Sequence, residues 1–270
     1  MPVKVARYVE IVGDAGWSVG RAVASMVSFV GELSIALAYA VLHPRKIRWR
    51  ETLYYMDMCG SGALPICALI CFLMGLILGF QGALQLHKYG GDIFLADFVA
   101  VLIVKEMGPL MIAVISTGRA GSAFAAEIGT MKVSEEIDAM LTMGFVPSRF
   151  LVIPKIIALV TVLPLLTIFG DLVGIVGGFI VGYTRLELPL SAYYNRTLIS
   201  ITPMYFAEGL IKSVVYAFII AAVGCMRGFE SDKDAQGVGR AATSAVVTSV
   251  FFLAVADAIF AVIFGVIIGR

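Results

Sequence analysis

The order of apolar and polar residues along the chain predicts five membrane-spanning helices. Apolar runs cover residues 62–83, 97–117, 152–183, 206–226 and 244–268. A helix needs about 20 such residues to cross a bilayer, and the runs do not alternate as the strands of a barrel would. The third run is long enough to tilt, bend or break.

An earlier run, residues 16–42, has a different pattern. Its polar residues recur at spacings of three and four and form one stripe along a helix: Ser18, Arg21, Ser25, Ser28 and Glu32. Such a stripe is typical of an amphipathic helix embedded in the membrane interface. A sixth span is the alternative.

Composition agrees with this pattern, because 60% of the residues are hydrophobic and only 14% are charged, whereas soluble domains are about a quarter charged. We therefore expect an all-α integral membrane protein that forms a single domain over residues 1–270. The net charge of +1 gives no indication of nucleic-acid binding.

The motifs of a P-loop and of a zinc protease are absent from the sequence. It contains neither G-x-x-x-x-G-K-[ST] nor H-E-x-x-H, and we expect neither an enzyme nor a cofactor bound by this chain. The four cysteines are Cys59, Cys67, Cys71 and Cys225; Cys67 and Cys71 share a helix face, but no histidine or carboxylate joins them there. We interpret them as packing residues and expect no metal site.

Lysine and arginine placement predicts the orientation. If residues 43–55 are cytoplasmic, that side holds eleven of these residues, and the other side holds Lys88, Arg185, Arg196 and Arg270. The eleven are Arg45, Lys46, Arg48, Arg50, Arg119, Lys132, Arg149, Lys155, Arg227, Lys233 and Arg240. We therefore expect a cytoplasmic N-terminus and a C-terminus on the outer, periplasmic side.

Charged residues within the second run are candidates for a site. Lys105 and Glu106 fall near its middle, just before Gly108-Pro109, and one charge there costs about 2.5–3.5 kcal/mol on insertion scales. One interpretation is a polar site in a cavity; the other is a structural ion pair with Asp257 or Asp171. Adjacent residues of a helix point about 100° apart, so we expect the two side chains to face different neighbours.

Two later runs also contain charges. Glu208 and Lys212 are one helical turn apart, and we expect them to pair with each other. Asp257 is isolated in the last run and needs a partner, for which Lys105 and Lys212 are the candidates.

Glycines recur at the four-residue spacing of close helix contacts. They are Gly75 and Gly79 in the first run and Gly170, Gly174, Gly178 and Gly182 in the third. Small residues at this spacing let helix backbones approach in lipid. Packing within one chain and packing between two copies both remain open.

A charged, glycine-rich block at 117–147 interrupts the apolar sequence. Its first part contains small residues that predict a packing ridge: Gly118, Gly121, Ser122, Ala125 and Gly129.

The second part of the block predicts a short amphipathic helix at 130–143, with Thr130 as N-cap. Ile137, Met140, Leu141 and Gly144 form one face, and Lys132, Glu135, Glu136 and Asp138 occupy the others. Such a helix suits docking into a groove of a soluble partner; a solvated loop helix is the alternative.

This block and several other segments resemble one family. GRAGSAFAAEIGTMKVSEEIDAMLTMGFVP, preceded by Lys105-Glu106-Met107-Gly108-Pro109, is similar to the MlaE (YrbE) permeases, as are GLILGFQG (75–82), LPLLTIFGDLVGIVGG (163–178) and GVGRAATSAVV (237–247). These permeases are the membrane subunits of ABC transporters that act on lipids together with MCE proteins. The similarity runs from about residue 60 to the end.

The resemblance implies a fold and a set of partners. The fold is five transmembrane helices after an embedded amphipathic helix, with 130–143 as the cytoplasmic coupling helix on an ATPase subunit that binds ATP and Mg. The other partners are a second copy, an MCE-domain protein outside the membrane and a small STAS-type regulatory subunit. The implied ATPase contacts are Thr130, Met131, Lys132, Glu135, Glu136, Asp138, Ala139 and Met140.

The resemblance also implies an outward-facing lipid cavity between two copies. Its expected lining is Leu76, Phe80, Leu84, Lys105, Glu106 and Asp257. A position that can be arginine in the family is lysine at 105, which keeps the charge but weakens bidentate phosphate binding. We therefore expect a phospholipid permease of a bacterial inner membrane. The alternatives are an ion-coupled secondary transporter that uses Glu106 and Asp257 as proton sites, and a scaffold without a transport path.

Overall fold

The structure is a computed structural model that describes residues 28–29, 31–39, 42–43 and 47–268. These residues form helices and connecting turns, and none of them is in a strand. Most of the predicted interfacial helix at 16–42 lies outside the described residues, although 31–39 is helical. The all-α prediction is confirmed.

From Trp49 onward, ten α-helices follow along the described chain. They are α2 (Trp49–Gly60), α3 (Leu64–His87), α4 (Leu95–Leu102), α5 (Gly108–Ser116), α6 (Ser122–Val133), α7 (Glu136–Thr142), α8 (Ile153–Leu186), α9 (Leu190–Ser200), α10 (Pro203–Phe229) and α11 (Ala235–Val262). Short π-helical turns occupy Ile103–Met107, Thr117–Gly121, Ser148–Val152 and Ile263–Ile268.

Five helical stretches of the described chain are long and apolar enough to cross a membrane. They are Trp49–His87, Asp92–Val133, Ser148–Leu186, Pro203–Phe229 and Ala235–Val266. Each predicted run falls within one of them, except for the last two residues of 244–268. The third span continues without a break in α8 although Pro164 lies inside it.

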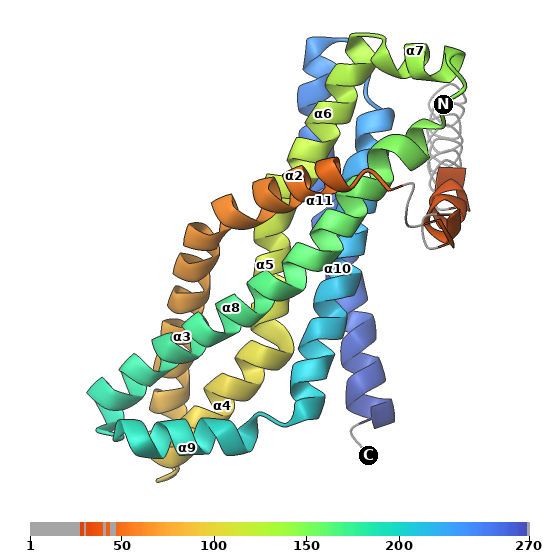
Figure 1. Ribbon diagram of the computed structural model, residues 1–270. Helices are drawn as coiled ribbons and strands as arrows, with labels where there is room; N and C mark the ends of the chain where they lie inside the picture. Colours follow the sequence, from red (N-terminus) through yellow and green to blue (C-terminus); the bar gives the residue numbers. More distant parts are fainter. Residues whose placement is uncertain (1–27, 30, 40–41, 44–46, 269–270) are drawn as a thin grey trace, which may run out of the picture.

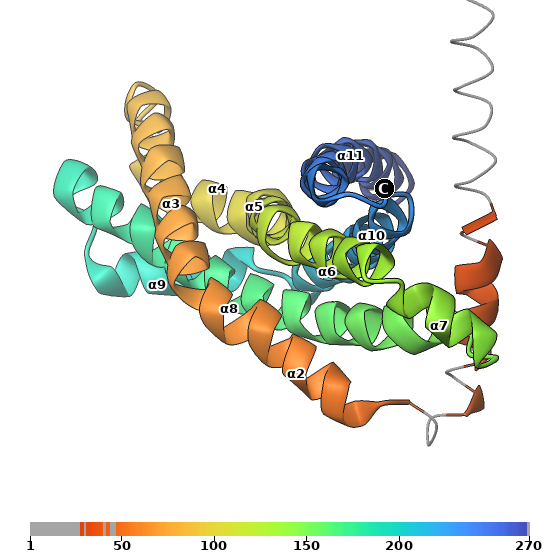
Figure 2. The same ribbon diagram turned by 90° about the horizontal axis from the view of Figure 1, so that it is seen from above.

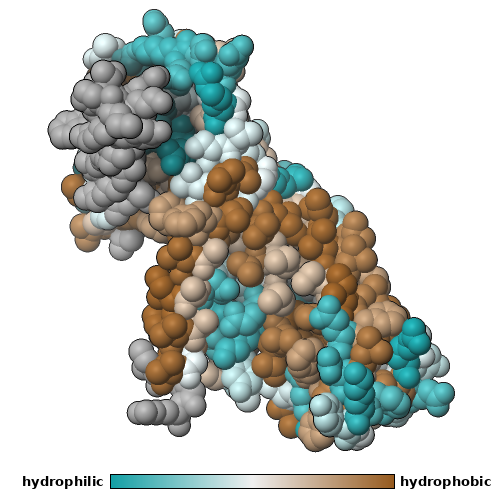
Figure 3. Space-filling model, turned by 180° about the vertical axis from the view of Figure 1, so that it is seen from behind, coloured by the Kyte–Doolittle hydropathy of each residue, from teal (hydrophilic) through white to brown (hydrophobic). Residues whose placement is uncertain are grey.

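The helices run between two ends of the molecule (Figures 1 and 2). The short helix α7 lies at one end and α9 at the other, and α3 and α11 stand on opposite sides of the α4–α6 stretch. The spans of α8 and α10 are the most buried and that of α11 the least. Figure 3 shows the hydrophobic belt between the two ends, as expected of a chain that spans a bilayer.

The glycine stripes serve packing between α3 and α8 within one chain. A Cβ on Gly75 would lie 1.9 Å from the carbonyl oxygen of Gly174, and one on Gly177 would lie 2.4 Å from that of Phe72. Backbones this close leave no room for a side chain, which explains the small residues on both helices.

The cysteines pack as predicted. All four are buried and free, and the Sγ of Cys71 would lie 2.8 Å from a Cβ on Gly170. The described part of the chain contains no cluster of histidine, cysteine and carboxylate side chains that could hold a metal ion.

Candidate functional site

A network of five charged side chains lies inside the membrane span and joins three segments. In the π turn Ile103–Met107, Lys105 Nζ lies 3.5 Å from Glu208 Oε2, and Glu106 Oε2 lies 2.5 Å from Lys212 Nζ. Lys212 also reaches Asp257 of α11 at 3.4 Å. The network thus holds the second span, α10 and α11 together at one level.

The network is buried on the α10 side and open elsewhere. The side chains of Glu208 and Lys212 are 3% and 0% exposed, whereas Lys105, Glu106 and Asp257 are 26%, 23% and 24% exposed. Figure 3 shows a hydrophilic patch within the hydrophobic belt. A polar group of a ligand therefore has access to both signs of charge inside the membrane.

Tyr216 completes the network from α10. Its hydroxyl donates a hydrogen bond to Asp257 Oδ1 at 2.6 Å, and the residue is fully buried. This bond fixes the Asp257 carboxylate between Lys212 and Tyr216, so its orientation is set by α10.

Local sequence explains why α10 approaches the π turn so closely. Pro109 has no N–H, and the Gly108 N–H donates to the Ile103 carbonyl five residues earlier, which produces the π register. Across from this turn a Cβ on Gly209 would lie 2.2 Å from the carbonyl oxygen of Val104. Glycine at 209 therefore lets its neighbours Glu208 and Lys212 reach Lys105 and Glu106.

Two expectations about this network are wrong. Lys105 and Glu106 do not face different neighbours, because the π turn and their long side chains bring both to α10. Their partners are Glu208 and Lys212, and not Asp257 or Asp171. Asp171 is buried beside Gly108, and its Oδ1 has no hydrogen-bond partner among the described residues.

The expected pairing of Glu208 with Lys212 is present at 3.9 Å, longer than either residue's contact with the second span. Lys212 is confirmed as the partner of Asp257. The first pair was expected because its members are one helical turn apart in the sequence, and the second because Asp257 is isolated in its run and needs a partner.

The apolar residues expected to line a cavity with this network lie apart from it in one chain. Phe80 and Leu84 are 42% and 67% exposed on α3, and α3 packs mainly along α8. The Arg185 guanidinium lies 5.2 Å from the Phe80 ring centroid. Leu76 packs against the cluster around Val99 and Ile103. A single chain therefore does not bring these residues together with Lys105.

The small-residue ridge exists, but only part of the predicted set forms it. Gly121, Ala125 and Gly129 are buried; a Cβ on Gly121 would lie 3.2 Å from Ile220 Cγ2, and one on Gly129 3.2 Å from Ser231 Oγ. Gly118 is exposed with nothing within 4 Å, and half-buried Ser122 donates a hydrogen bond to the Gly118 carbonyl. The π turn at Thr117–Gly121 shifts the packed face away from Gly118.

The predicted helix at 130–143 is two helices. Thr130 and Met131 belong to the end of α6, and the chain bends at Ser134 and Glu135, whose φ of 60° is left-handed. Thr130 is not an N-cap, because its hydroxyl donates to the Ala126 carbonyl inside α6. The short helix is therefore α7, Glu136–Thr142.

The exposed surface of this segment is acidic, as expected. Glu135, Glu136 and Ala139 are exposed, Met140 is half-buried, and Ile137 is buried against the core. Two lysines tie the segment to the rest of the chain: Lys132 Nζ donates to the Phe229 carbonyl at 2.6 Å, and Lys233 Nζ donates to Asp138 Oδ2 at 2.7 Å. Within the described part of the chain, Glu135 and Glu136 form no ion pair with a lysine.

Sequence reasoning missed a buried lysine near the α7 end. Lys155 is fully buried, and its Nζ donates to Glu127 Oε1 at 3.1 Å and to the Tyr55 hydroxyl at 2.9 Å. Tyr55 in turn donates to Glu127 Oε1 at 2.6 Å. The signal was present, since Lys155 lies inside an apolar run, but the partners are remote in sequence.

The described chain combines five apolar spans with a partly open charge network between them and a short exposed helix at one end. This combination is typical of a multi-pass membrane protein of the transport-subunit class. The family model "Permease MlaE" matches residues 52–263, and the chain belongs to this family of ABC transporter permeases. It is accordingly a permease subunit of an ABC transporter, and the class implies a partner ATPase.

Relatives from several organisms support the assignment. A probable ABC transporter permease protein of Rickettsia bellii (strain RML369-C) is 32% identical over 89% of this chain and 93% of its own. One from Rickettsia prowazekii (strain Madrid E) is 36% identical over 73% and 76%. The chloroplastic protein TRIGALACTOSYLDIACYLGLYCEROL 1 of Arabidopsis thaliana is 31% identical over 78% of this chain and 61% of its own.

Proposed function

We propose that this permease moves phospholipid between a bacterial inner membrane and an MCE-domain protein, driven by ATP hydrolysis in the partner ATPase. The observation that carries the proposal is the charge network, because Lys105, Glu106 and Asp257 keep partial exposure inside the membrane span. Charged groups are costly there and mark substrate paths by default. A structural ion-pair network has no need of an open side.

The charge balance favours a zwitterionic headgroup. Two lysines face three carboxylates, so an anionic lipid gains little net attraction. In our proposal Lys105 receives the phosphate, and Glu106 and Asp257 receive the amine of a lipid such as phosphatidylethanolamine.

The acyl chains require a second surface. Leu76, Phe80 and Leu84 lie on α3, apart from Lys105 in one chain, and α11 exposes apolar side chains such as Phe251 at 63%. In our proposal two copies pair so that α3 of one copy and the network of the other close a single lipid cavity, with the MCE protein at the α9 end.

Coupling to ATP hydrolysis is proposed to enter at α7. We place the α7 end and the N-terminus in the cytoplasm, following the charge asymmetry, and the C-terminus in the periplasm. The ATPase, which holds ATP and Mg, docks on the segment from Thr130 to Met140, and a STAS-type subunit is proposed as a regulator of that ATPase. In this proposal the motion passes along the Gly121–Gly129 ridge of α6 to the π turn Ile103–Met107, which contains Lys105 and Glu106.

Substitution of the network tests the transport path. We expect Lys105→Leu with Glu106→Gln to abolish ATP-dependent movement of labelled phosphatidylethanolamine in proteoliposomes while the complex still assembles. The control Arg240→Gln, which removes only exposed ion pairs, is expected to transport normally. A scaffold tolerates the double substitution. A secondary transporter instead requires an ion gradient, works without the ATPase and depends on Glu106 and Asp257.

Charge reversal tests the docking surface separately. We expect Glu135→Lys with Glu136→Lys to abolish co-purification of the ATPase subunit, because these exposed carboxylates form no ion pair with a lysine among the described residues. Glu187→Lys, an exposed carboxylate with the same left-handed backbone before α9, is the matched control. Intact co-purification and normal ATP hydrolysis in the double variant would show that docking lies elsewhere.

A further inference from the structure

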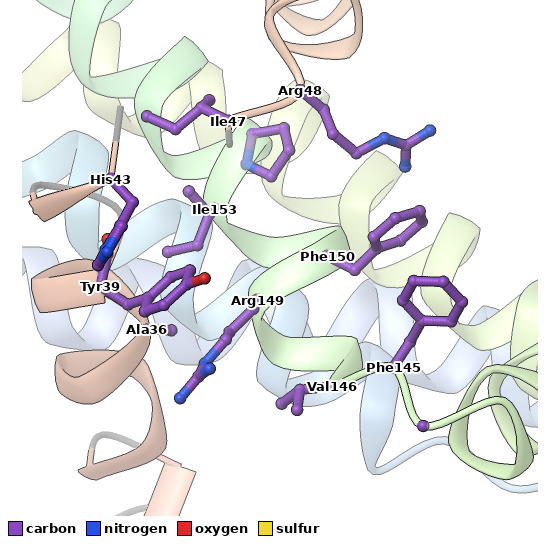
Figure 4. A pocket seen from close by; sticks show the side chains of 12 residues that line it. Ala36, Tyr39, His43, Ile47, Arg48, Phe145, Val146, Arg149, Phe150 and Ile153 are labelled. Carbon is purple, nitrogen blue, oxygen red and sulfur yellow. The ribbon is translucent and has the colours of Figure 1, made fainter. Parts of the chain in front are cut away.

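A pocket lies near the α7 end, away from the charge network. It has a volume of about 410 Å³ and is enclosed by three segments: the helix at 31–39 with His43, the stretch Ile47–Arg48 before α2, and residues 144–154 that lead from α7 into α8. Figure 4 shows Tyr39 and His43 on one wall, Phe145 and Phe150 on the other, and Arg149 between them.

The pocket combines aromatic rings with basic groups. The Arg149 guanidinium lies 4.7 Å from the Tyr39 ring centroid, and that of Arg48 lies 4.0 Å from the Phe150 ring. His43 stacks on Tyr39 at 4.6 Å. The rings hold both guanidinium planes in place and leave the N–H edge of Arg149 free to donate.

The charges in the pocket are not balanced. Arg48 pairs with Glu51, but Arg149 forms no ion pair within the described residues, and none of the described residues that line the pocket is a carboxylate. In sequence, Arg45, Lys46 and Arg50 are also close by. A negatively charged group is the missing partner.

The remaining lining is apolar and partly open. Ile47, Val146, Ile153 and Pro154 complete the walls, and Phe145 and Val146 are 48% and 47% exposed. A ligand that carries both an anion and a hydrocarbon portion matches this lining, whereas a free ion leaves the apolar walls unoccupied.

We propose that this pocket binds the headgroup phosphate of an anionic phospholipid of the cytoplasmic leaflet, with Arg149 as its main ligand and the lipid chains against Ile47 and Ile153. Basic pockets between helices on the cytoplasmic side are suited to anionic headgroups, and guanidinium groups bind phosphate through paired hydrogen bonds. This lipid is a resident ligand, distinct from the lipid that is transported. Its placement rests on the cytoplasmic assignment of the α7 end.

The site has a consequence for coupling. Its walls include Gly144 and Phe145, and the Phe145 N–H donates to the carbonyl of Met140 in α7. A bound headgroup therefore contacts both the loop that follows α7 and the helix at 31–39 and restrains the loop. The anionic lipid content of the leaflet would then determine how firmly α7 is held in place.

Photo-crosslinking tests the site directly. The full-length permease in phosphatidylcholine nanodiscs receives a small fraction of phosphatidylglycerol that carries a diazirine near its headgroup, and labelled peptides are identified by mass spectrometry. We expect adducts within residues 36–48 and 144–154. Arg149→Gln should reduce them about fivefold, the effect of one basic residue near an anionic surface. Arg149→Lys, which keeps the charge and checks that the chain is folded, should reduce them less.

The controls separate lipid from other sources of label. Arg240→Gln removes an exposed arginine elsewhere and should leave the adducts unchanged. Equal labelling by diazirine phosphatidylcholine, loss of label on addition of millimolar inorganic phosphate, or unchanged label in Arg149→Gln would each overturn the proposal. Lys105→Leu with Glu106→Gln should leave this label intact, so a failure of the transport proposal is distinguishable.

Discussion

The contact between Gly209 and Val104 gives a sharp test of how the charge network is assembled. In Gly209→Ala the new Cβ would lie 2.2 Å from the Val104 carbonyl oxygen, whereas such carbon–oxygen contacts are normally about 3.3 Å. The obstacle is backbone on both sides, so α10 must move away by about 1 Å.

The displacement reaches the ion pairs beside it. A shift of about 1 Å would lengthen the 2.5 Å contact of Lys212 with Glu106 to about 3.5 Å, beyond a hydrogen bond. Overpacking costs about 1–3 kcal/mol, and a hydrogen bond to a charged group contributes about 1.5–3 kcal/mol. With partial relaxation we expect a loss of about 2–4 kcal/mol in the free energy of unfolding.

Two measurements check this expectation. The midpoint of thermal unfolding in detergent should fall by roughly 5–10 °C, and ATP-dependent lipid transport should fall about tenfold or more, the equivalent of at least about 1.4 kcal/mol. The control is Gly239→Ala, because a Cβ there meets nothing within 4 Å and alanine is the better helix former. Unchanged stability and transport in Gly209→Ala would refute the reasoning.

Two further predictions concern the α7 end. Glu127→Gln should lower the free energy of unfolding by about 1–3 kcal/mol, because it leaves Lys155 fully buried without its carboxylate. Lys155→Met should lower the free energy of unfolding less, because Glu127 is 38% exposed and water can solvate it. The reverse order of the two midpoints of thermal unfolding would contradict this. The hydrogen bond to Asp138 raises the pKa of Lys233 above its usual value. While the Asp138 carboxylate is ionised, the pair therefore contributes at pH values below the ordinary lysine pKa of about 10.4, and it is lost as the pH rises through the raised value. Above neutral pH, a spin label at Leu141→Cys should gain mobility only in strongly alkaline buffer, and Asp138→Asn should make it mobile at neutral pH.

The spans could be predicted from the sequence because the bilayer imposes one requirement on each run separately. An apolar stretch of sufficient length such as 206–226 is recognisable without knowing its neighbours. The pairing of Lys212 with Asp257 was also within reach, since an isolated charge in a span needs a partner and few exist.

The network as a whole could not be predicted, because its geometry depends on a change of helical register. Spacing rules assume the α-helical repeat, and the π turn at Ile103–Met107 departs from it. Lys155 was missed for another reason: its partners Tyr55 and Glu127 lie in two other helices, and no local pattern links them.

The order in which the network's members are synthesised has a consequence for biogenesis. Lys105 and Glu106 enter the membrane with the second span, yet Lys212 follows Glu106 by 106 residues. At about 5–20 residues per second, these two charges wait roughly 5–20 s for their partners, each at an insertion cost of about 2.5–3.5 kcal/mol. The second span must therefore stay beside the insertion machinery, or in another polar environment, until α10 has been synthesised. Truncated chains that end before Pro203 should remain attached there or be degraded, whereas chains that include α10 should be released.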